Sequence, residues 1–333
     1  MGKRNSKALS TFDKSNIKYY YGITNYSTQY FNSKFSPLEA FEYAYRIGLN
    51  FLFLTDHNLY ISEEIYFKDS IYSKFQVNKL SAHKIKKKYD NFIPIVGFNC
   101  STSNYGNISI INPNNYFTGI IRDFKILALW MLNNPDSFIT INNNSTNLLP
   151  HNNILNKLIT SVEVSNKRSN NKLINYEKYY FNLLDRGWKL GAINTENNYT
   201  LNIRNSENLT ACICNNLSSN NIIYSFKERR TYSTESRYLK FYFTINDIFM
   251  GEELPYTSKK LRFMIFAEDI KFKIREIQII SNNGIIIRKI ENINLNTIKY
   301  LYEHTRKDNE DWYIIKILEN EDKTAYSSPI FIV

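Results

Sequence analysis

The chain of 333 residues has few of the residue types that hold metals or cross-link a fold. It contains only four histidines (His57, His83, His151 and His304) and three cysteines (Cys100, Cys212 and Cys214). The cysteines form neither a disulfide framework nor a zinc motif. Cys212 and Cys214 are two positions apart in a strand-like stretch, so we expect both thiols to be buried on one face of a sheet. Four scattered histidines are too few for a polyhistidine metal centre.

Long hydrophobic runs are also missing. No stretch of about 18 apolar residues occurs, which argues against a membrane-spanning helix. Residues 1–16 have no apolar core, so we expect no secretory signal peptide and a cytoplasmic location. Export by a dedicated machine and assembly into a particle both stay open, because neither requires a secretory signal peptide. Gly2 and Ser6 fit the N-myristoylation pattern, and modification of Gly2 stays open.

Composition indicates a basic globular protein. Hydrophobic residues make up 43% of the chain, enough for a sizeable core, and the net charge of +11 raises the question of an anionic partner. The basic residues are mostly scattered. The densest run, at 83–90 (HKIKKKYD), lies on an expected helix, where a solvated helix face is the usual explanation. Binding of nucleic acid or another anionic polymer is therefore an alternative that the sequence does not favour.

Strand and helix patterns alternate up to about residue 235. This order predicts an α/β architecture with a mostly parallel sheet or barrel. The expected strands are 18–23, 50–56, 92–99, 107–112, 137–144 and 189–195, and the expected helices are 37–48, 73–90, 120–134 and 175–188, with a helix leading into a strand over 154–166.

After Tyr238 the pattern changes to alternating β-branched and aromatic residues. The stretch SNNG at 281–284 separates two such runs, as in an antiparallel hairpin. We therefore predict three parts: a polar N-terminal segment (1–17), an α/β barrel (18–236) and a small β-sandwich-like domain (237–333).

The carboxyl ends of parallel strands are where functional groups are expected. Asp56 and His57 directly follow the strand pattern of 50–56. A carboxylate next to an imidazole suits a metal ligand or a proton-transfer pair, but a helix-capping Asp is an equal alternative.

The surrounding sequence carries a resemblance. Residues 19–58, YYYGITNYSTQYFNSKFSPLEAFEYAYRIGLNFLFLTDHN, resemble the opening of the PHP (polymerase and histidinol phosphatase) metallohydrolases, in particular the CehA/McbA-like branch. Similar stretches continue to the C-terminus: 93–112, 138–144, 183–199, 227–236, 245–254 and 325–333. The resemblance implies a distorted TIM-like barrel whose His, Asp and Glu side chains bind zinc or manganese and activate water for phosphoester hydrolysis.

Most of the implied metal-ligand positions hold other residue types in this chain. His57 is kept, whereas the remaining positions hold Asn25, Ser27, Asn32, Asn99, Asn107, Asn143, Asn197 and Tyr199. A neutral amide is a poor ligand for transition metals. We therefore expect no metal cofactor, at most a weakly held ion at His57. The expected protein is a catalytically inactive pseudoenzyme that keeps the fold as a binding, scaffold or structural component.

Several alternatives stay open. One is a residual or altered hydrolase, for which Asp56 and His57 are weak catalytic candidates. Together with Ser27 they have the residue types of a nucleophilic triad. Arg229 and Arg230 suit either packing or anion binding. Glu163 also matches a family position.

The partner is open as well. The candidates are an unidentified protein, a second copy of the chain, or a polar small molecule in the asparagine-lined barrel mouth.

Overall fold

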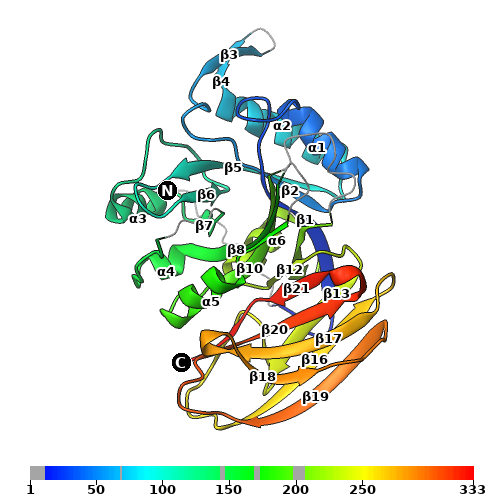
Figure 1. Ribbon diagram of the computed structural model, residues 1–333. Coiled ribbons are helices and arrows are strands. Elements are labelled where there is room, and N and C mark those ends of the chain that lie inside the picture. Colours follow the sequence, from blue (N-terminus) through cyan, green and yellow to red (C-terminus); the bar gives the residue numbers. More distant parts are fainter. Residues whose placement is uncertain (1–11, 68–69, 143–146, 169–172, 198–206) are drawn as a thin grey trace, which may run out of the picture.

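The computed structural model describes residues 12–67, 70–142, 147–168, 173–197 and 207–333. In Figure 1 the helices gather around the upper part of the molecule, and the lower part consists of strands. This is the α/β barrel with a C-terminal antiparallel β domain that the sequence predicts. Within the described ranges, none of the helices has the length and apolar composition of a membrane span.

A curled sheet forms the barrel part. Six of its strands run in one direction: β1 (Lys18–Tyr26), β2 (Phe51–Leu54), β5 (Ile93–Ser101), β7 (Phe138–Ile141), β8 (Ile159–Arg168) and β10 (Gly191–Asn197). Four further strands run antiparallel to their neighbours: β6 (Asn107–Ile111), β9 (Leu173–Asn175), β11 (Leu209–Cys214) and β12 (Thr231–Thr234). The expected α/β barrel is present, and its sheet is mixed because β6, β9, β11 and β12 are antiparallel to their neighbours. The short link from β5 to β6 contains no crossover helix, so the chain turns straight back.

One end of the curled sheet, strand β10, contacts the middle of the same sheet through side chains. The hydroxyl group of Thr24 on β1 donates to the carbonyl oxygen of Asn194 on β10 (3.0 Å), and Thr210 of β11 donates to the same oxygen (2.9 Å). These bonds connect β10 to β1 and β11 without a strand ladder, so side-chain contacts hold the curl of the sheet.

In the described parts of the chain, six helices lie around the sheet. They are α1 (Pro37–Arg46), α2 (Lys74–Lys88), α3 (Phe124–Leu132), α4 (Leu155–Leu158), α5 (Glu177–Asp185) and α6 (Ser219–Lys227). Ser36 and Ser73 cap α1 and α2 in capping boxes, which satisfy free N–H groups of the first turns. Beside α2, the hairpin of β3 (Glu64–Phe67) and β4 (Ser70–Ser73) projects at the top of Figure 1.

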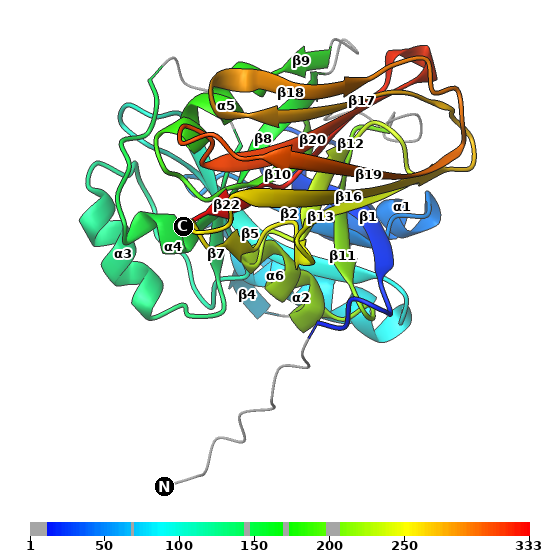
Figure 2. The same ribbon diagram turned by 90° about the horizontal axis from the view of Figure 1, so that it is seen from below.

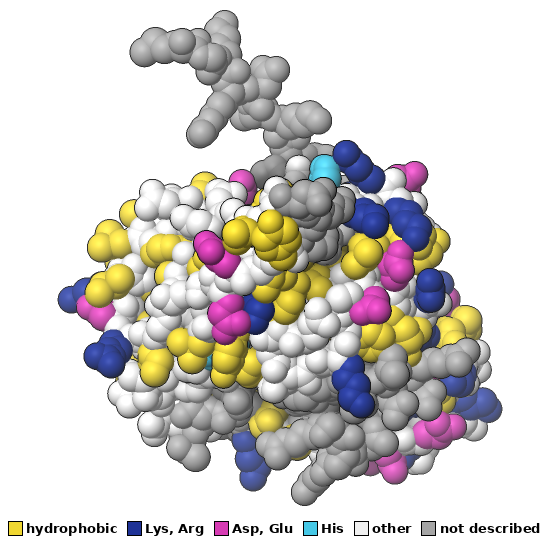
Figure 3. All heavy atoms as spheres, turned by 90° about the horizontal axis from the view of Figure 1, so that it is seen from above, with side chains coloured by type: hydrophobic (Ala, Val, Ile, Leu, Met, Phe, Trp, Pro, Cys, Tyr) yellow, Lys and Arg dark blue, Asp and Glu magenta, His cyan; other side chains and the backbone are white. Residues whose placement is uncertain are grey.

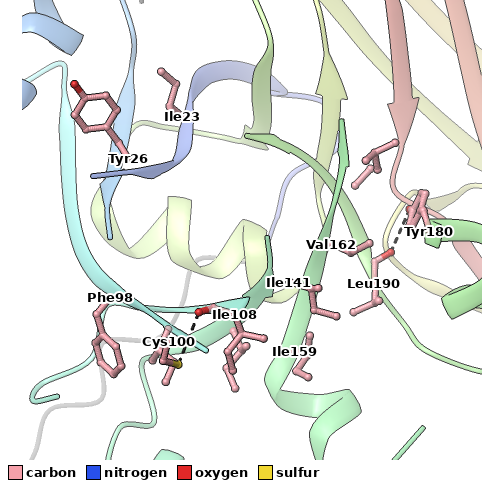
Figure 4. Close-up of a cluster of buried hydrophobic side chains, with 14 of the residues drawn as sticks. Ile23, Tyr26, Phe98, Cys100, Ile108, Ile141, Ile159, Val162, Tyr180 and Leu190 are labelled. Atoms are coloured by element: carbon pink, nitrogen blue, oxygen red, sulfur yellow. Dashed lines mark hydrogen bonds between the residues drawn. The ribbon is translucent and has the colours of Figure 1, made fainter. Parts of the chain in front are cut away.

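The interior of the barrel part is apolar. Figure 4 shows side chains from β1, β5, β6, β7 and β8 meeting in one cluster, among them Ile23, Phe98, Ile108, Ile141 and Val162. All three cysteines are free and buried, as expected. Cys212 and Cys214 both lie in a second cluster, between the sheet and α6.

The C-terminal part consists of two layers of strands (Figure 2). One layer contains β13 (Leu239–Ile245), β14 (Ile248–Phe249), β16 (Lys260–Asp269) and β19 (Thr297–Thr305). The other contains β15 (Glu253–Leu254), β17 (Ile274–Ser281), β18 (Ile285–Ile290), β20 (Trp312–Glu319), β21 (Thr324–Ser327) and β22 (Ile330–Ile332). The predicted hairpin at 281–284 is present: 3-10 turn η2 (Asn282–Gly284) joins β17 to β18, and Asn283 has a φ of 59°. A second 3-10 turn, η3 (Asn320–Asp322), joins β20 to β21.

The main sheet continues from the barrel part into the second layer, because β12 pairs with β21. The boundary between 236 and 237 remains a prediction.

Candidate functional site

The carboxyl ends of β1, β2 and β5 bring three of the predicted site residues together. Asn25 lies near the end of β1, His57 follows β2, and Asn99 lies near the end of β5. The backbone carries the ladder beyond β2, with Asn99 N donating to Asp56 O (3.0 Å) and Asn58 N donating to Asn99 O (2.8 Å). All three residues are buried, with exposed fractions of 7–8%. These three residues therefore lie together at the barrel mouth.

Two of these residues are central to a network of amides and hydroxyl groups. Asn25 Oδ1 accepts from Thr55 Oγ1 (2.5 Å) and from Asn99 Nδ2 (3.0 Å). Asn99 Oδ1 in turn accepts from Ser109 Oγ (2.5 Å) and Asn142 Nδ2 (3.4 Å). An amide oxygen has two lone pairs and can accept two hydrogen bonds. Each of these two oxygens already accepts two, so neither has a free lone pair.

The network does not fit a zinc or manganese site. A cation would have to displace a donor from each amide oxygen, and neutral amides would still not supply the imidazole or carboxylate ligands these metals prefer. Among the described residues, no group of three or more His, Cys, Asp or Glu side chains is placed to hold a metal ion.

Asp56 is fully buried and joins two segments next to the site. Its carboxylate accepts from Thr28 N (2.6 Å), Thr28 Oγ1 (2.8 Å) and Asn78 Nδ2 (2.9 Å). Burial raises the pKa of the Asp56 carboxyl group above its usual value, and these hydrogen bonds act in the opposite direction. Because its partners lie in the turn after β1 and on α2, the helix-capping alternative was wrong.

His57 makes different contacts from those a triad needs. Its Nε2 lies 3.2 Å from Ser101 Oγ, and its Nδ1 lies 3.4 Å from Leu59 N. Burial lowers the pKa of the imidazole, which favours the neutral form. The described hydrogen bonds link neither His57 to Ser27 nor His57 to Asp56, so the triad alternative finds no geometric support.

The remaining predicted positions are spread out. Ser27 is buried, Asn32 is exposed in the turn after β1, and Asn107 begins β6 with a partly exposed side chain. The backbone of Asn197 pairs with Arg168 at the end of β10. Asn143 and Tyr199 lie outside the described residues.

Glu163, which matches a family position, belongs to a second buried network between β8 and β10. Its Oε1 accepts from Asn166 Nδ2 (2.5 Å) and from the hydroxyl group of Thr195. Nearby, Ser165 donates to Asn194 Oδ1 (3.0 Å) and Asn208 Oδ1 (2.8 Å). Asn166 and Thr195, the hydrogen-bond partners named here, are both uncharged.

Arg229 and Arg230 make different contacts. Arg230 is buried, with its guanidinium 4.3 Å from the ring centre of Phe12 and 4.8 Å from that of Tyr224. These contacts fit the packing role, one of the two alternatives for Arg230. Arg229 lies instead over the ring of Phe331, with its guanidinium 5.7 Å from the ring centre, and it donates from Nε to Gly251 O (3.1 Å).

Three members of the amide network were not predicted: Thr55, Ser109 and Asn142. For Ser109 and Asn142, the sequence contains a signal in the pattern of apolar and polar residues along the strands. Ser109 interrupts the apolar run of β6, and Asn142 follows the apolar run of β7. Polar residues at such positions need partners, because buried polar groups are almost always hydrogen-bonded.

Comparison with known proteins places the fold. No protein-family model and no curated protein match the sequence. A solved structure of a two-domain protein from Bacteroides vulgatus, which contains a predicted PHP-like metal-dependent phosphoesterase, covers 100% of this chain and 99% of its own length. The TM-score is 0.53 and the sequence identity is 14%. The two proteins share a fold.

This likeness confirms the PHP-like architecture and, at 14% identity, shows the fold alone. The CehA/McbA-like branch remains a prediction. An engineered protein (7% identity, 86% of this chain and 49% of that one) and a modular endo-β-1,4-mannanase from Cellulomonas fimi (5%, 85% and 64%) match with TM-scores of 0.23, which carry no argument.

Proposed function

We propose that this chain is a catalytically inactive protein of PHP-like fold that acts as a binding or scaffold component. The observation that carries the proposal is the amide network at the barrel mouth. The amide oxygens of Asn25 and Asn99 stand at implied ligand positions, and each accepts two hydrogen bonds from neighbouring side chains. The mouth is thereby stabilised without an ion.

The proposal follows from what hydrolysis requires. In a metal-dependent phosphoesterase the ions lower the pKa of bound water and polarise the phosphoryl oxygens. Here His57 alone keeps its residue type, and a single neutral imidazole does not hold a divalent ion tightly at micromolar concentrations. Asp56 is bound to Thr28 and Asn78.

An exposed apolar face supports a role in protein contacts. On α3, the side chains of Ile126, Leu129 and Leu132 are 67%, 64% and 73% exposed. Three large apolar groups on one short helix are unusual for a surface that stays in water. We expect light scattering to show self-association, or co-purification to show a partner, that Leu129→Glu weakens.

Binding of an anionic polymer has less support. Figure 3 shows one face of the molecule, on which lysine and arginine side chains are interspersed with acidic ones. Extended phosphate backbones bind best to continuous basic surfaces. Retention on heparin that falls steeply with salt would favour this alternative.

Metal analysis combined with a phosphodiesterase assay tests the main proposal. The purified protein is loaded with Zn²⁺ or Mn²⁺, desalted, analysed for metal and assayed with bis(p-nitrophenyl) phosphate. We expect less than stoichiometric metal and no hydrolysis above background.

His57→Ala is the matched variant for this experiment. Stoichiometric metal together with activity that His57→Ala abolishes would establish the residual hydrolase instead. Activity that survives the substitution indicates a contaminant or a different site.

A further inference from the structure

A large cleft lies at the opposite end of the barrel from the mouth. It has a volume of about 850 Å³ and is lined where β7, β8 and β10 begin, by Ser137 and Phe138, Leu158 and Thr160, and Gly187 and Lys189. In Figure 2, which views the molecule from below, α4, β7 and α6 lie near the C-terminus around this region. Small-molecule sites have volumes of about 300–1,000 Å³.

Cationic side chains from separate segments converge on this cleft. Lys157 comes from α4, Lys189 precedes β10, Lys227 ends α6, and Arg229 follows it. The lining contains two carboxylates, Glu228 and Glu253, and Glu253 is paired with Lys189 (2.6 Å). Four cations against two carboxylates leave a positive cleft. His151, Asn153, Asn156, Ser137 and Thr160 add neutral hydrogen-bonding groups.

Arg229 is held in an unusual backbone conformation within this cleft. Its φ is 55°, a left-handed value that residues other than glycine seldom adopt. The turn at Gly251 packs directly on it, and a Cβ on Gly251 would lie only 2.7 Å from Arg229 O. Hydrogen bonds from Nε to Gly251 O (3.1 Å) and from Nη1 to Lys227 O (3.4 Å) orient the guanidinium. A guanidinium has five N–H donors, so others remain for a ligand.

Partial burial makes these cations receptive to an anion. Burial lowers the pKa of Lys227 and of Arg229, which means that their charged forms are incompletely solvated. Lys227 Nζ donates to Pro135 O (2.7 Å), and an ammonium group has two further donors. An anion between these side chains would replace the missing hydration with charge-assisted hydrogen bonds.

We propose that this cleft binds a small, multiply charged phosphorylated molecule. The oriented guanidinium of Arg229 would donate to the phosphoryl oxygens, and Lys157 and Lys227 would bind the same group from either side. The phosphoryl group fits because it offers several oxygens to donors that arrive from different directions. The excess of positive charge favours a dianion over a monocarboxylate. This inference goes beyond the proposed function, and it is independent of the metal content of the barrel mouth.

Titration calorimetry with inorganic pyrophosphate, at about 50 mM salt, tests the proposal. We expect one saturable site, and inorganic phosphate should bind to it more weakly. Lys157→Gln/Lys227→Gln should weaken pyrophosphate binding at least about tenfold, since hydrogen bonds to charged groups are strong. Glu253→Gln should tighten binding about threefold, because it removes a competing carboxylate. If these side chains only stabilised the fold, removing positive charge and removing negative charge would not change the affinity for pyrophosphate in opposite directions.

The matched control is Lys84→Gln/Lys87→Gln. Both lysines are exposed on α2, and the double variant changes the net charge by the same amount. It should bind pyrophosphate like the unaltered protein. Absence of saturable binding, or equal weakening in the α2 control, would overturn the proposal, and circular dichroism of each variant checks that the fold is kept.

Discussion

Replacing Glu319 with glutamine should flatten the pH dependence of stability. Glu319 ends β20 and is only 1% exposed, and it lies against Asp269, which is also fully buried. Asp269 already accepts from Lys271 N (2.7 Å), Phe272 N (2.8 Å) and Ser236 Oγ (2.5 Å). Among the described residues no side chain or backbone group donates to the buried carboxyl oxygens of Glu319, so burial beside Asp269 favours the protonated form of Glu319.

The pKa of Glu319 gives the sign and the size of the effect. Burial, followed by the nearby Asp269, raises this pKa to about 9, from 4.5 for an unperturbed group. Between these values the folded state binds one proton more than the unfolded state, so stability is greatest below pH 4.5 and falls as the pH rises towards 9. The limiting slope is about 1.4 kcal/mol per pH unit. From about pH 5.5 to 8.5 we expect a loss of about 2–4 kcal/mol from this group.

Urea unfolding across this pH range measures the effect. A glutamine at 319 does not titrate, so Glu319→Gln should lose far less stability over this pH range than the unaltered protein. Glu321→Gln is the control, because Glu321 is exposed two positions away. Parallel stability curves for the unaltered protein and Glu319→Gln would refute the raised pKa of Glu319 as the cause.

Three further predictions concern the barrel. Asn99→Asp replaces the amide that donates to Asn25 with a carboxylate oxygen, which should cost about 2–4 kcal/mol near pH 7.5 and less near pH 5, as measured by urea midpoints. Asp56→Ala leaves the donors of Thr28 and Asn78 without their acceptor, so we expect a loss of about 3–5 kcal/mol in chemical unfolding, and Asp56→Asn should lose less. Gly22→Ala places a Cβ 2.3 Å from the carbonyl oxygen of Phe51, and thermal unfolding should show a loss of about 1–3 kcal/mol; an unchanged midpoint would contradict the close approach of β1 and β2.

The sequence predicted the regular elements of the barrel well where hydrophobic periodicity is strong. Helix α1 is an example, since Ser36, Pro37 and Gly48 mark its two ends and the structure places the helix between them. Helix α6 was not predicted. Its first turn contains two asparagines, which have low helix propensity, and only two of its apolar residues, Ile222 and Phe226, are buried.

The candidate site was predicted in part. Positions at the ends of parallel strands can be found from the sequence because strand ends meet in space, and Asn25, His57 and Asn99 do meet. Hydrogen-bond partners contributed by neighbouring strands, such as Ser109 and Asn142, depend on sheet register, which one sequence does not define. Strand β6 itself was predicted, but its antiparallel direction was not, for the same reason.

The pairing of β12 with β21 has a mechanical consequence. Tyr232, Ser233 and Thr234 are paired with Ser327, Tyr326 and Ala325, so backbone hydrogen bonds span the predicted boundary at 236. Rotation of one half against the other would have to break this ladder, which leaves no hinge at that point for opening and closing. The two halves should unfold in a single cooperative transition. A fragment ending at residue 236 would leave β12 as a bare edge and should aggregate instead of folding alone.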